Sequence, residues 1–170
     1  MILDPLPSAP LGDSLLAELT ALYASNSALH RLTGDFPDPE DIRPGQVAAT
    51  LSQEWEQPGT DILLARGSGR LIGIAVTLAH HPDPADPDPW IGLLMVDASL
   101  HGQGHGRRLA ALVENRFRAA GRTAARLAVL ANNPKALAFW TSLGYEVLDH
   151  REDRGMRRPC TVLRKDLTTP

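Results

Sequence analysis

Apolar residues in the first sixty positions recur every three or four residues, the spacing of helices with one buried face. The first stripe follows Asp13 and Ser14, either of which can cap a helix, and it predicts a helix over 13–30. The second stripe follows Pro44, which suits a first helical turn, and it ends at residues 58–59. The stripes consist of Leu15, Leu16, Leu19, Leu22 and Tyr23, and of Val47, Leu51 and Trp55.

The pattern then changes to short runs rich in Ile, Leu and Val, which predict strands. Runs at 61–66 and 70–78 are separated by Gly-Ser-Gly, so we expect an antiparallel hairpin. Residues 80–89 read HHPDPADPDP, and so many prolines exclude a central strand or a helix and predict an exposed loop. Residues 90–96 form a nearly continuous apolar run, which is typical of a strand buried on both faces.

A glycine-rich turn at 101–106 leads into another stretch of helical spacing, which Gly121 closes. The apolar residues of this helix are Leu109, Leu112, Val113, Phe117 and Ala120. The elements expected after it are a strand at 124–130, a helix at 134–143, and strands at 145–150 and 161–167. We find neither an internal repeat nor a linker, so the pattern predicts a single α/β domain over residues 1–170.

The composition and charge of the chain exclude several classes of function. With 170 residues, 43% of them hydrophobic and 22% charged, the chain has the balance of one globular domain. Its net charge of −3 offers no basic surface for a nucleic acid, and no run approaches the roughly 20 apolar residues that span a membrane. The start lacks a secretion signal, and the single cysteine, Cys160, excludes an internal disulfide. We therefore expect a cytoplasmic protein that acts on small molecules, with no nucleic-acid or membrane partner.

The turn HGQGHG places Gly102, Gly104 and Gly106 between a buried strand and the start of a helix. The first N–H groups of a helix have no internal partners and carry the positive end of the helix dipole, so they can bind a phosphate. Arg107 and Arg108 either add contacts to phosphate oxygens or are solvated helix residues. Because turns also need glycine for conformational reasons alone, the surrounding sequence has to decide.

Two common nucleotide-binding motifs do not match this turn. A P-loop requires Gly-Lys-Ser/Thr, where this chain has Gly106, Arg107 and Arg108. A Rossmann motif requires G-x-G-x-x-G and an acidic residue about 20 positions later. The turn reads G-x-G-x-G instead, and residues 124–126 include no acid.

The chain resembles the GCN5-related N-acetyltransferase (GNAT) family in two segments. The coenzyme motif of the family, Q/R-x-x-G-x-G/A after a strand, corresponds to LLMVDASLHGQGHGRRL at 93–109, and a second motif corresponds to NPKALAFWTSLGYEV, which begins at Asn133. The resemblance covers about 63–147 and implies an acyl-CoA N-acyltransferase fold. That fold is mixed α/β, with a mostly antiparallel sheet flanked by helices, and the strands at 90–96 and 124–130 are expected to splay apart at the coenzyme site.

The resemblance also implies a cosubstrate, acetyl-CoA, and no metal. Backbone groups of Met95 and Val96 would bind the pantetheine arm, amides of the glycine turn would bind the pyrophosphate, and the side chain of Asn133 would reach the coenzyme. Asn133 alternatively only caps a helix, with Pro134 in its first turn. The implied coenzyme-binding residues are Met95, Val96, His101, Gly102, Gln103, Gly104, His105, Gly106, Arg107, Asn133, Phe139 and Trp140.

Two positions depart from the family pattern. His101 stands where the family has Gln or Arg. Trp140 stands where the family often has a tyrosine that protonates the departing thiolate, and an indole cannot supply that proton. Tyr145, another group or water then acts as the acid, or the protein binds an acyl-CoA without catalysis.

The general base is also open, because an attacking ammonium must first lose a proton. By location the candidates are Asp88, His80, His81 and Asp97, but each is more readily interpreted as a solvated loop residue. We therefore assign no catalytic residue. The acids of the 80–89 loop lack the calcium-loop pattern, so we expect no metal there, but their charge could attract a cationic amine.

The predicted function is direct transfer of the acetyl group of acetyl-CoA to a primary amine of a small molecule or peptide, without an acyl-enzyme. The alternative is a non-catalytic acyl-CoA-binding sensor or regulatory protein of the same fold, which Trp140 motivates. A third interpretation is that the glycine turn is only a turn. The sequence does not identify the acceptor, and although relatives form homodimers, no apolar patch marks an interface.

Overall fold

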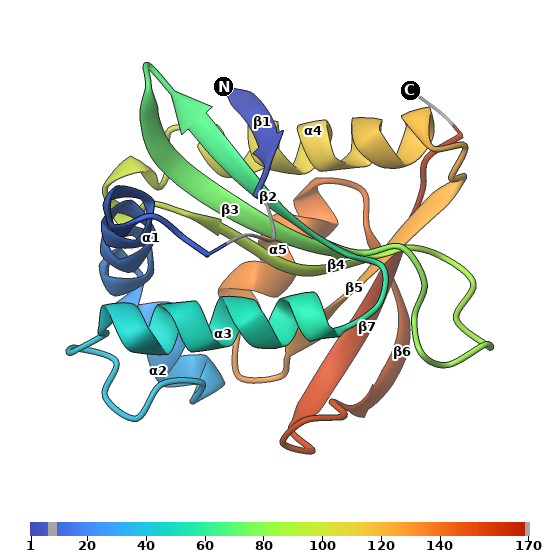
Figure 1. Cartoon of the computed structure of the whole chain (residues 1–170). Coiled ribbons are helices and arrows are strands. Elements are labelled where there is room, and N and C mark those ends of the chain that lie inside the picture. The colour runs from blue at the N-terminus through green and yellow to red at the C-terminus, as the bar shows by residue number, and fades with distance from the viewer. Residues whose placement is uncertain (7–9, 169–170) are drawn as a thin grey trace.

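The computed structural model describes residues 1–6 and 10–168 (Figure 1). Within them, seven strands form one sheet in the order β1-β2-β3-β4-β5-β7-β6. The strands are β1 (Ile2–Pro5), β2 (Thr60–Gly67), β3 (Arg70–Leu78), β4 (Trp90–Val96), β5 (Ala124–Leu130), β6 (Glu146–Glu152) and β7 (Pro159–Asp166). All neighbouring strands are antiparallel except β4 and β5, so the predicted mixed, mostly antiparallel sheet is confirmed.

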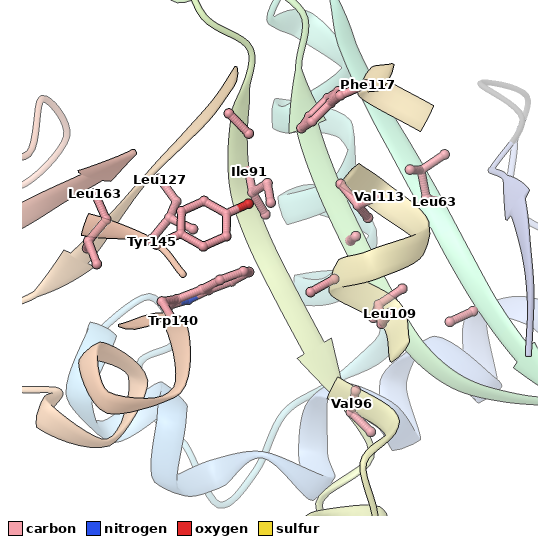
Figure 2. Packing of buried hydrophobic residues seen from close by; sticks show 14 of the residues in the cluster. Leu63, Ile91, Val96, Leu109, Val113, Phe117, Leu127, Trp140, Tyr145 and Leu163 are labelled. Atoms are coloured by element: carbon pink, nitrogen blue, oxygen red, sulfur yellow. The ribbon is translucent and has the colours of Figure 1, made fainter. Parts of the chain in front are cut away.

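Helices cover both faces of this sheet (Figure 1). They are α1 (Asp13–Ser25), α2 (Ser27–Thr33), α3 (Pro44–Glu56), α4 (His105–Ala119) and α5 (Pro134–Ser142), with a short 3-10 helix, η1 (Ala98–Leu100). One hydrophobic cluster joins α1 and α3 to the sheet, and a second joins α4 and α5 to the opposite face. In Figure 2, Leu109, Val113 and Phe117 of α4 lie against the sheet, and Tyr145 lies between Leu127 of β5 and Ile91 of β4.

The helix predicted over 13–30 is in fact two helices that meet at Asn26. The side chain of Asn26 is buried, and its amide nitrogen donates to the carbonyl oxygens of Leu22 (3.0 Å) and Val96 (3.1 Å). Val96 ends β4, so the break is stabilised by a contact across 70 positions of sequence. The apolar spacing continues on both sides of Asn26, which is why the pattern alone does not reveal the break.

Strand β1 was not predicted from the sequence. It pairs with the outer edge of β2, with Ile2 opposite Arg66 and Pro5 opposite Leu63. Proline is tolerated in an edge strand because one side of that strand needs no ladder hydrogen bond. The short segment therefore becomes a strand because it pairs with β2, which is distant in the sequence, and its own residues show no strand pattern.

The proline-rich segment at 80–89 is a loop, as predicted, but it is not fully exposed. The Asp86 side chain is only 5% exposed and makes ion pairs with Arg126 of β5 and with Arg151 of β6 (3.0 Å). The Asp88 carboxylate accepts hydrogen bonds from Arg126 and Arg164, each at 2.9 Å. Arginines from three strands thus hold the loop against the end of the sheet, because a buried carboxylate requires such partners.

Candidate functional site

The sheet opens between β4 and β5. These strands pair only at Trp90 with Arg126 and at Ile91 with Leu127, and they diverge beyond these pairs. A register shift places Gly92 as an extra residue opposite β3 at this point. Gly92 is exposed and the next two residues are half-buried, so the expectation of a strand buried on both faces holds only at its ends. The predicted splay between these two strands is confirmed.

The glycine turn lies at the open end of this gap, after β4 and before α4. Gly102 has φ +76° and Gly104 has φ +83°, backbone conformations that favour glycine, and a Cβ at either position would meet no atom within 4 Å. The first α-helical bond here runs from the Arg108 N–H to the Gly104 carbonyl (3.0 Å). The preceding N–H groups, from His105 to Arg107, therefore have no partner within the helix.

The His101 side chain turns back towards β4. Its Nε2 donates to the carbonyl oxygen of Val96 (2.9 Å), which also accepts from Asn26 (3.1 Å). Backbone groups of Val96 are expected to contact pantetheine, but its carbonyl oxygen already accepts these two hydrogen bonds. Of the His101 ring nitrogens, Nδ1 is the one left to face a phosphate.

The side chains of Gln103 and Arg107 frame the turn without filling it. Gln103 Nε2 donates to the Ser99 carbonyl (3.1 Å), and the Arg107 guanidinium approaches the Ser142 hydroxyl of α5 at 3.4 Å. A Cβ at Gly106 would lie 3.4 Å from the Phe139 ring, so a small residue at this position lets α4 approach α5 closely. The start of α4 therefore lies against the second half of α5.

The capping prediction for Asn133 is confirmed, because its Oδ1 accepts from the Ala136 N–H (3.0 Å) at the start of α5. This contact leaves the amide nitrogen of Asn133 available to donate to a ligand. Further along α5, Trp140 is buried and packs edge-on against Phe139 and Tyr145, with ring centroids 5.1 Å apart in both pairs.

Tyr145 lies in the core and not on the surface of the gap. It is 1% exposed, and its hydroxyl has no hydrogen-bond partner within the described residues. Burial raises the pKa of the Tyr145 phenol, and the nearby Glu114 carboxylate raises it further. Both effects favour the neutral hydroxyl and oppose its use as a proton donor that must ionise.

The candidate bases lie at the two ends of β4, which are about 20 Å apart at 3.3 Å per residue. His81 stacks on Trp90 at the start of the strand, where Asp88 is also paired with two arginines. Exposed His80 lies 3.2 Å from Arg122. At the other end Asp97 accepts from the N–H (2.9 Å) and hydroxyl (2.7 Å) of Ser99, and these bonds hold its pKa below the ordinary value.

These placements change the interpretation of the 80–89 loop. Arginines within the protein neutralise Asp86 and Asp88, so those carboxylates do not present free charge to an incoming amine. Among the described residues no three His, Cys, Asp or Glu side chains gather as metal ligands, and none of the helices described has the length and apolarity to cross a membrane.

The structure also groups residues to which the sequence assigned no function. Tyr23 was placed only in the apolar stripe of the first helix, and His30 received no role. The Tyr23 and His30 rings stack with centroids 5.7 Å apart, and the sequence signal for this contact is weak because each residue belongs to a different helix.

Comparison with known proteins agrees with this geometry. A family model described as the acetyltransferase (GNAT) family matches residues 25–145. A curated mycothiol acetyltransferase of Thermomonospora curvata is 31% identical over 146 residues, which are 84% of this chain and 48% of that protein. The chain spans about half the length of the curated relatives it matches.

Solved structures share the fold. An acetyltransferase from Thermus thermophilus superposes with a TM-score of 0.70 at 22% identity, covering 98% of this chain and 97% of the other. A GNAT family acetyltransferase from Elizabethkingia anophelis with acetyl-CoA bound gives a TM-score of 0.63 at 14% identity, covering 97% of both chains. The acyl-CoA N-acyltransferase fold expected from the sequence is therefore confirmed.

Proposed function

The chain belongs to the acetyltransferase (GNAT) family, and from this premise we propose that it transfers the acetyl group of acetyl-CoA directly to a primary amine. The observation that carries the proposal is the gap between β4 and β5, which ends at a glycine turn with free backbone N–H groups. A long ligand with an anionic pyrophosphate matches both features, because the gap admits an extended arm and the helix start binds phosphate.

The residues present fit acetyl-CoA. A Cβ at Gly102 or Gly104 would fill open space beside the turn. In this space the pyrophosphate would contact the backbone N–H groups from Gly102 to Arg107. Backbone groups of Met95 would face the pantetheine arm along the unpaired part of β4, and the free amide nitrogen of Asn133 would donate to the coenzyme. Bound acetyl-CoA supplies an acyl group activated as a thioester.

We propose that the amine attacks the thioester carbonyl as its neutral form, so that the C–N bond forms as the C–S bond breaks. Direct attack is favoured because Cys160 is buried and burial raises its thiol pKa, which argues against an acyl-enzyme. Neither Trp140 nor Tyr145 is a suitable acid, so water would protonate the thiolate. A thiol has a pKa of about 8.5, so its anion is a tolerable leaving group even without a dedicated acid.

Replacing Tyr145 by phenylalanine tests this assignment. We expect kcat to stay within about twofold of wild type, because the hydroxyl is buried without a partner and its removal costs little. The measurement is steady-state thiol release, with the thermal midpoint recorded for both proteins. A loss of kcat above about tenfold (1.4 kcal/mol) at an unchanged midpoint would identify Tyr145 as the acid and contradict the proposal.

Thermal unfolding with and without acetyl-CoA tests the cofactor. A ligand at 100 times its Kd stabilises the folded state by about 2.7 kcal/mol, which corresponds to roughly 5–10 °C for a chain of this size. NAD and ATP are the controls, and a shift for acetyl-CoA alone is the expected result. No shift of the thermal midpoint at millimolar acetyl-CoA would mean that the glycines of the turn have only a conformational role.

An amine panel with thiol detection then separates catalysis from sensing. A second candidate function is a non-catalytic acyl-CoA sensor. Trp140 favours it, because this indole is buried at the position where the family often has a tyrosine that protonates the departing thiolate. Thiol release with at least one primary amine is expected for the enzyme. Selective binding of acetyl-CoA without release from any amine would favour the sensor.

A further inference from the structure

His101 begins the glycine turn, and its backbone has no donor left for an anion. The His101 N–H donates to the carbonyl oxygen of Ala98 at 3.2 Å, at the end of η1. The backbone at His101 is extended, with φ −62° and ψ 150°, and the residue is exposed. A hydrogen bond from His101 to an anion at the turn must therefore come from its imidazole ring.

The position of this ring is fixed by a hydrogen bond to β4. Nε2 lies 2.9 Å from the Val96 carbonyl oxygen and must carry the proton of that bond, because a carbonyl only accepts. The same oxygen accepts from the buried amide of Asn26 at 3.1 Å. The N–H of Ala98 donates to the Ser25 hydroxyl at 3.1 Å. The junction of α1 and α2 thus holds the segment after β4 in place, and with it the acceptor of the ring.

The other ring nitrogen, Nδ1, lies beside the turn. It is bonded to Cγ, so it stays close to the backbone of His101 and Gly102 while Nε2 reaches back to β4. Within the described residues Nδ1 has no hydrogen-bond partner, since the ring bonds only through Nε2. A Cβ at Gly102 or at Gly104 would meet no atom within 4 Å, so there is open space next to this nitrogen.

A neutral His101 ring would not suit a phosphate in that space. With its proton on Nε2, the neutral ring has a lone pair on Nδ1, which only accepts. Phosphate oxygens are acceptors too, so the two groups would repel each other. An imidazolium carries a proton on both nitrogens and donates to the Val96 carbonyl and to a phosphate oxygen at once. Histidine is the side chain that changes between these two forms near neutral pH.

Asp97 is the acid that faces this ring, from the other end of η1. Its carboxylate accepts from the N–H (2.9 Å) and the hydroxyl (2.7 Å) of Ser99. These bonds hold the pKa of Asp97 below its ordinary value, and the charges of Arg70 on β3 and of His101 lower it further. The residues of η1 itself carry no charge. An ionised Asp97 favours the imidazolium form of His101.

The start of α4 opposes a positive ring until an anion binds. The helix dipole places positive charge at the first N–H groups, and the basic side chains there are His105, Arg107 and Arg108. A pyrophosphate at the turn adds negative charge beside the ring and so favours a proton on Nδ1. If protonation strengthens binding, binding favours protonation to the same extent.

We propose that His101 binds the pyrophosphate of the coenzyme as an imidazolium, with Nε2 donating to Val96 and Nδ1 donating to a phosphate oxygen, so that coenzyme binding takes up a proton; this inference rests on the proposed acetyl-CoA site. The proton comes from solvent and returns to it when the coenzyme leaves. Affinity for the coenzyme therefore rises as the pH falls, because the complex holds more protons than the separate partners. The acceptor amine has the opposite requirement, since it must lose a proton to attack.

Calorimetric titration with 3′-dephospho-coenzyme A tests the proposal. This probe keeps the pyrophosphate and lacks the phosphate monoester, whose second pKa of about 6 would itself titrate. In the wild-type protein Kd should be about tenfold higher at about pH 8 than at about pH 5.5, close to the effect of one hydrogen bond to a charged group. In His101→Gln, whose amide donates without titrating, Kd should stay within about twofold over this range. His105→Gln changes the other histidine of the turn and should keep the wild-type dependence.

The protons taken up can also be counted directly. The same titrations in two buffers of different ionisation enthalpy should give proton uptake for the wild-type protein and for His105→Gln, but not for His101→Gln. The thermal midpoint of each protein without ligand, recorded at both pH values, separates loss of the fold from loss of binding.

A Kd for dephospho-coenzyme A that does not change with pH in the wild-type protein, or the same pH dependence in His101→Gln, would overturn the proposal and leave the acetyl-CoA site in place. Failure of both dephospho-coenzyme A and acetyl-CoA to bind at every pH would overturn the proposed function as well.

Discussion

Replacing Gly104 by alanine should weaken coenzyme A binding by at least about 100-fold, or about 2.7 kcal/mol, while the fold survives. The backbone at Gly104 has φ +83°, and its missing side chain leaves the space that the pyrophosphate is proposed to occupy. A methyl group there would block the cradle and displace the first N–H groups of α4, each of which contributes about 1.5–3 kcal/mol when it binds a charged group. Calorimetric titration with coenzyme A measures the loss.

Gly121→Ala is the matched control for this variant. Gly121 follows the other end of the same helix, has φ +73° and also has open space around its Cβ position. Both substitutions should lower the free energy of unfolding by about 1–2 kcal/mol, the cost of a left-handed conformation for alanine. Only the Gly104 variant should lose coenzyme binding. Equal affinities in the two variants would show that the turn does not contact the coenzyme.

Removing the Asp86 carboxylate should cause the largest loss of stability. We expect Asp86→Ala to lower the free energy of unfolding by about 3–5 kcal/mol, because the change leaves Arg126 and Arg151 partly buried with fewer negative partners. Urea unfolding at pH 7 provides the measurement. Asp83→Ala on the same loop is the control, since its side chain is 42% exposed and its ion pair with Arg154 is 3.8 Å long. The control should lose less than about 1 kcal/mol.

The loss from Asp86→Ala should also depend on pH. Burial alone would raise the pKa of Asp86, but Arg151, with Arg126 and His81, outweighs burial and holds the pKa below its ordinary value. A carboxyl whose pKa is lower in the folded state contributes its stability above the unfolded pKa of about 3.9 and loses it as the pH falls through the folded value. The part of the difference between wild type and Asp86→Ala that comes from the Asp86 charge should thus persist down to about pH 5 and shrink below about pH 4. A difference under about 1 kcal/mol at pH 7 would contradict the buried-pair account.

Features with a local cause could be predicted from the amino-acid sequence. Ser68 and Gly69 both have positive φ, as a two-residue hairpin turn requires, and this turn was recognised from Gly-Ser-Gly between two apolar runs. The cap at Asn133 and the left-handed Gly144 after α5 were similarly evident. Each of these features depends on neighbours within a few residues, whose identities are visible along the chain.

Features with a distant cause required the folded structure. The break at Asn26 depends on Val96, and the burial of Asp86 depends on arginines of β5 and β6, so neither follows from the residues nearby. The stacking of Tyr23 on His30 is a further case, because the two residues belong to ordinary helical patterns and their rings meet only where α1 and α2 pack together.

Periodicity and turn chemistry along the chain thus account for the order of the α-helices and strands from α3 onward, and for a glycine turn between β4 and α4. Three-dimensional packing decides where β4 and β5 part, which loop carboxylates arginines neutralise, and which buried polar atoms lack a partner among the described residues. The physical reason is the separation along the chain of the residues that interact. Capping and turn formation join residues a few positions apart, whereas strand pairing and burial of charge depend on groups that meet only when the whole sheet has formed.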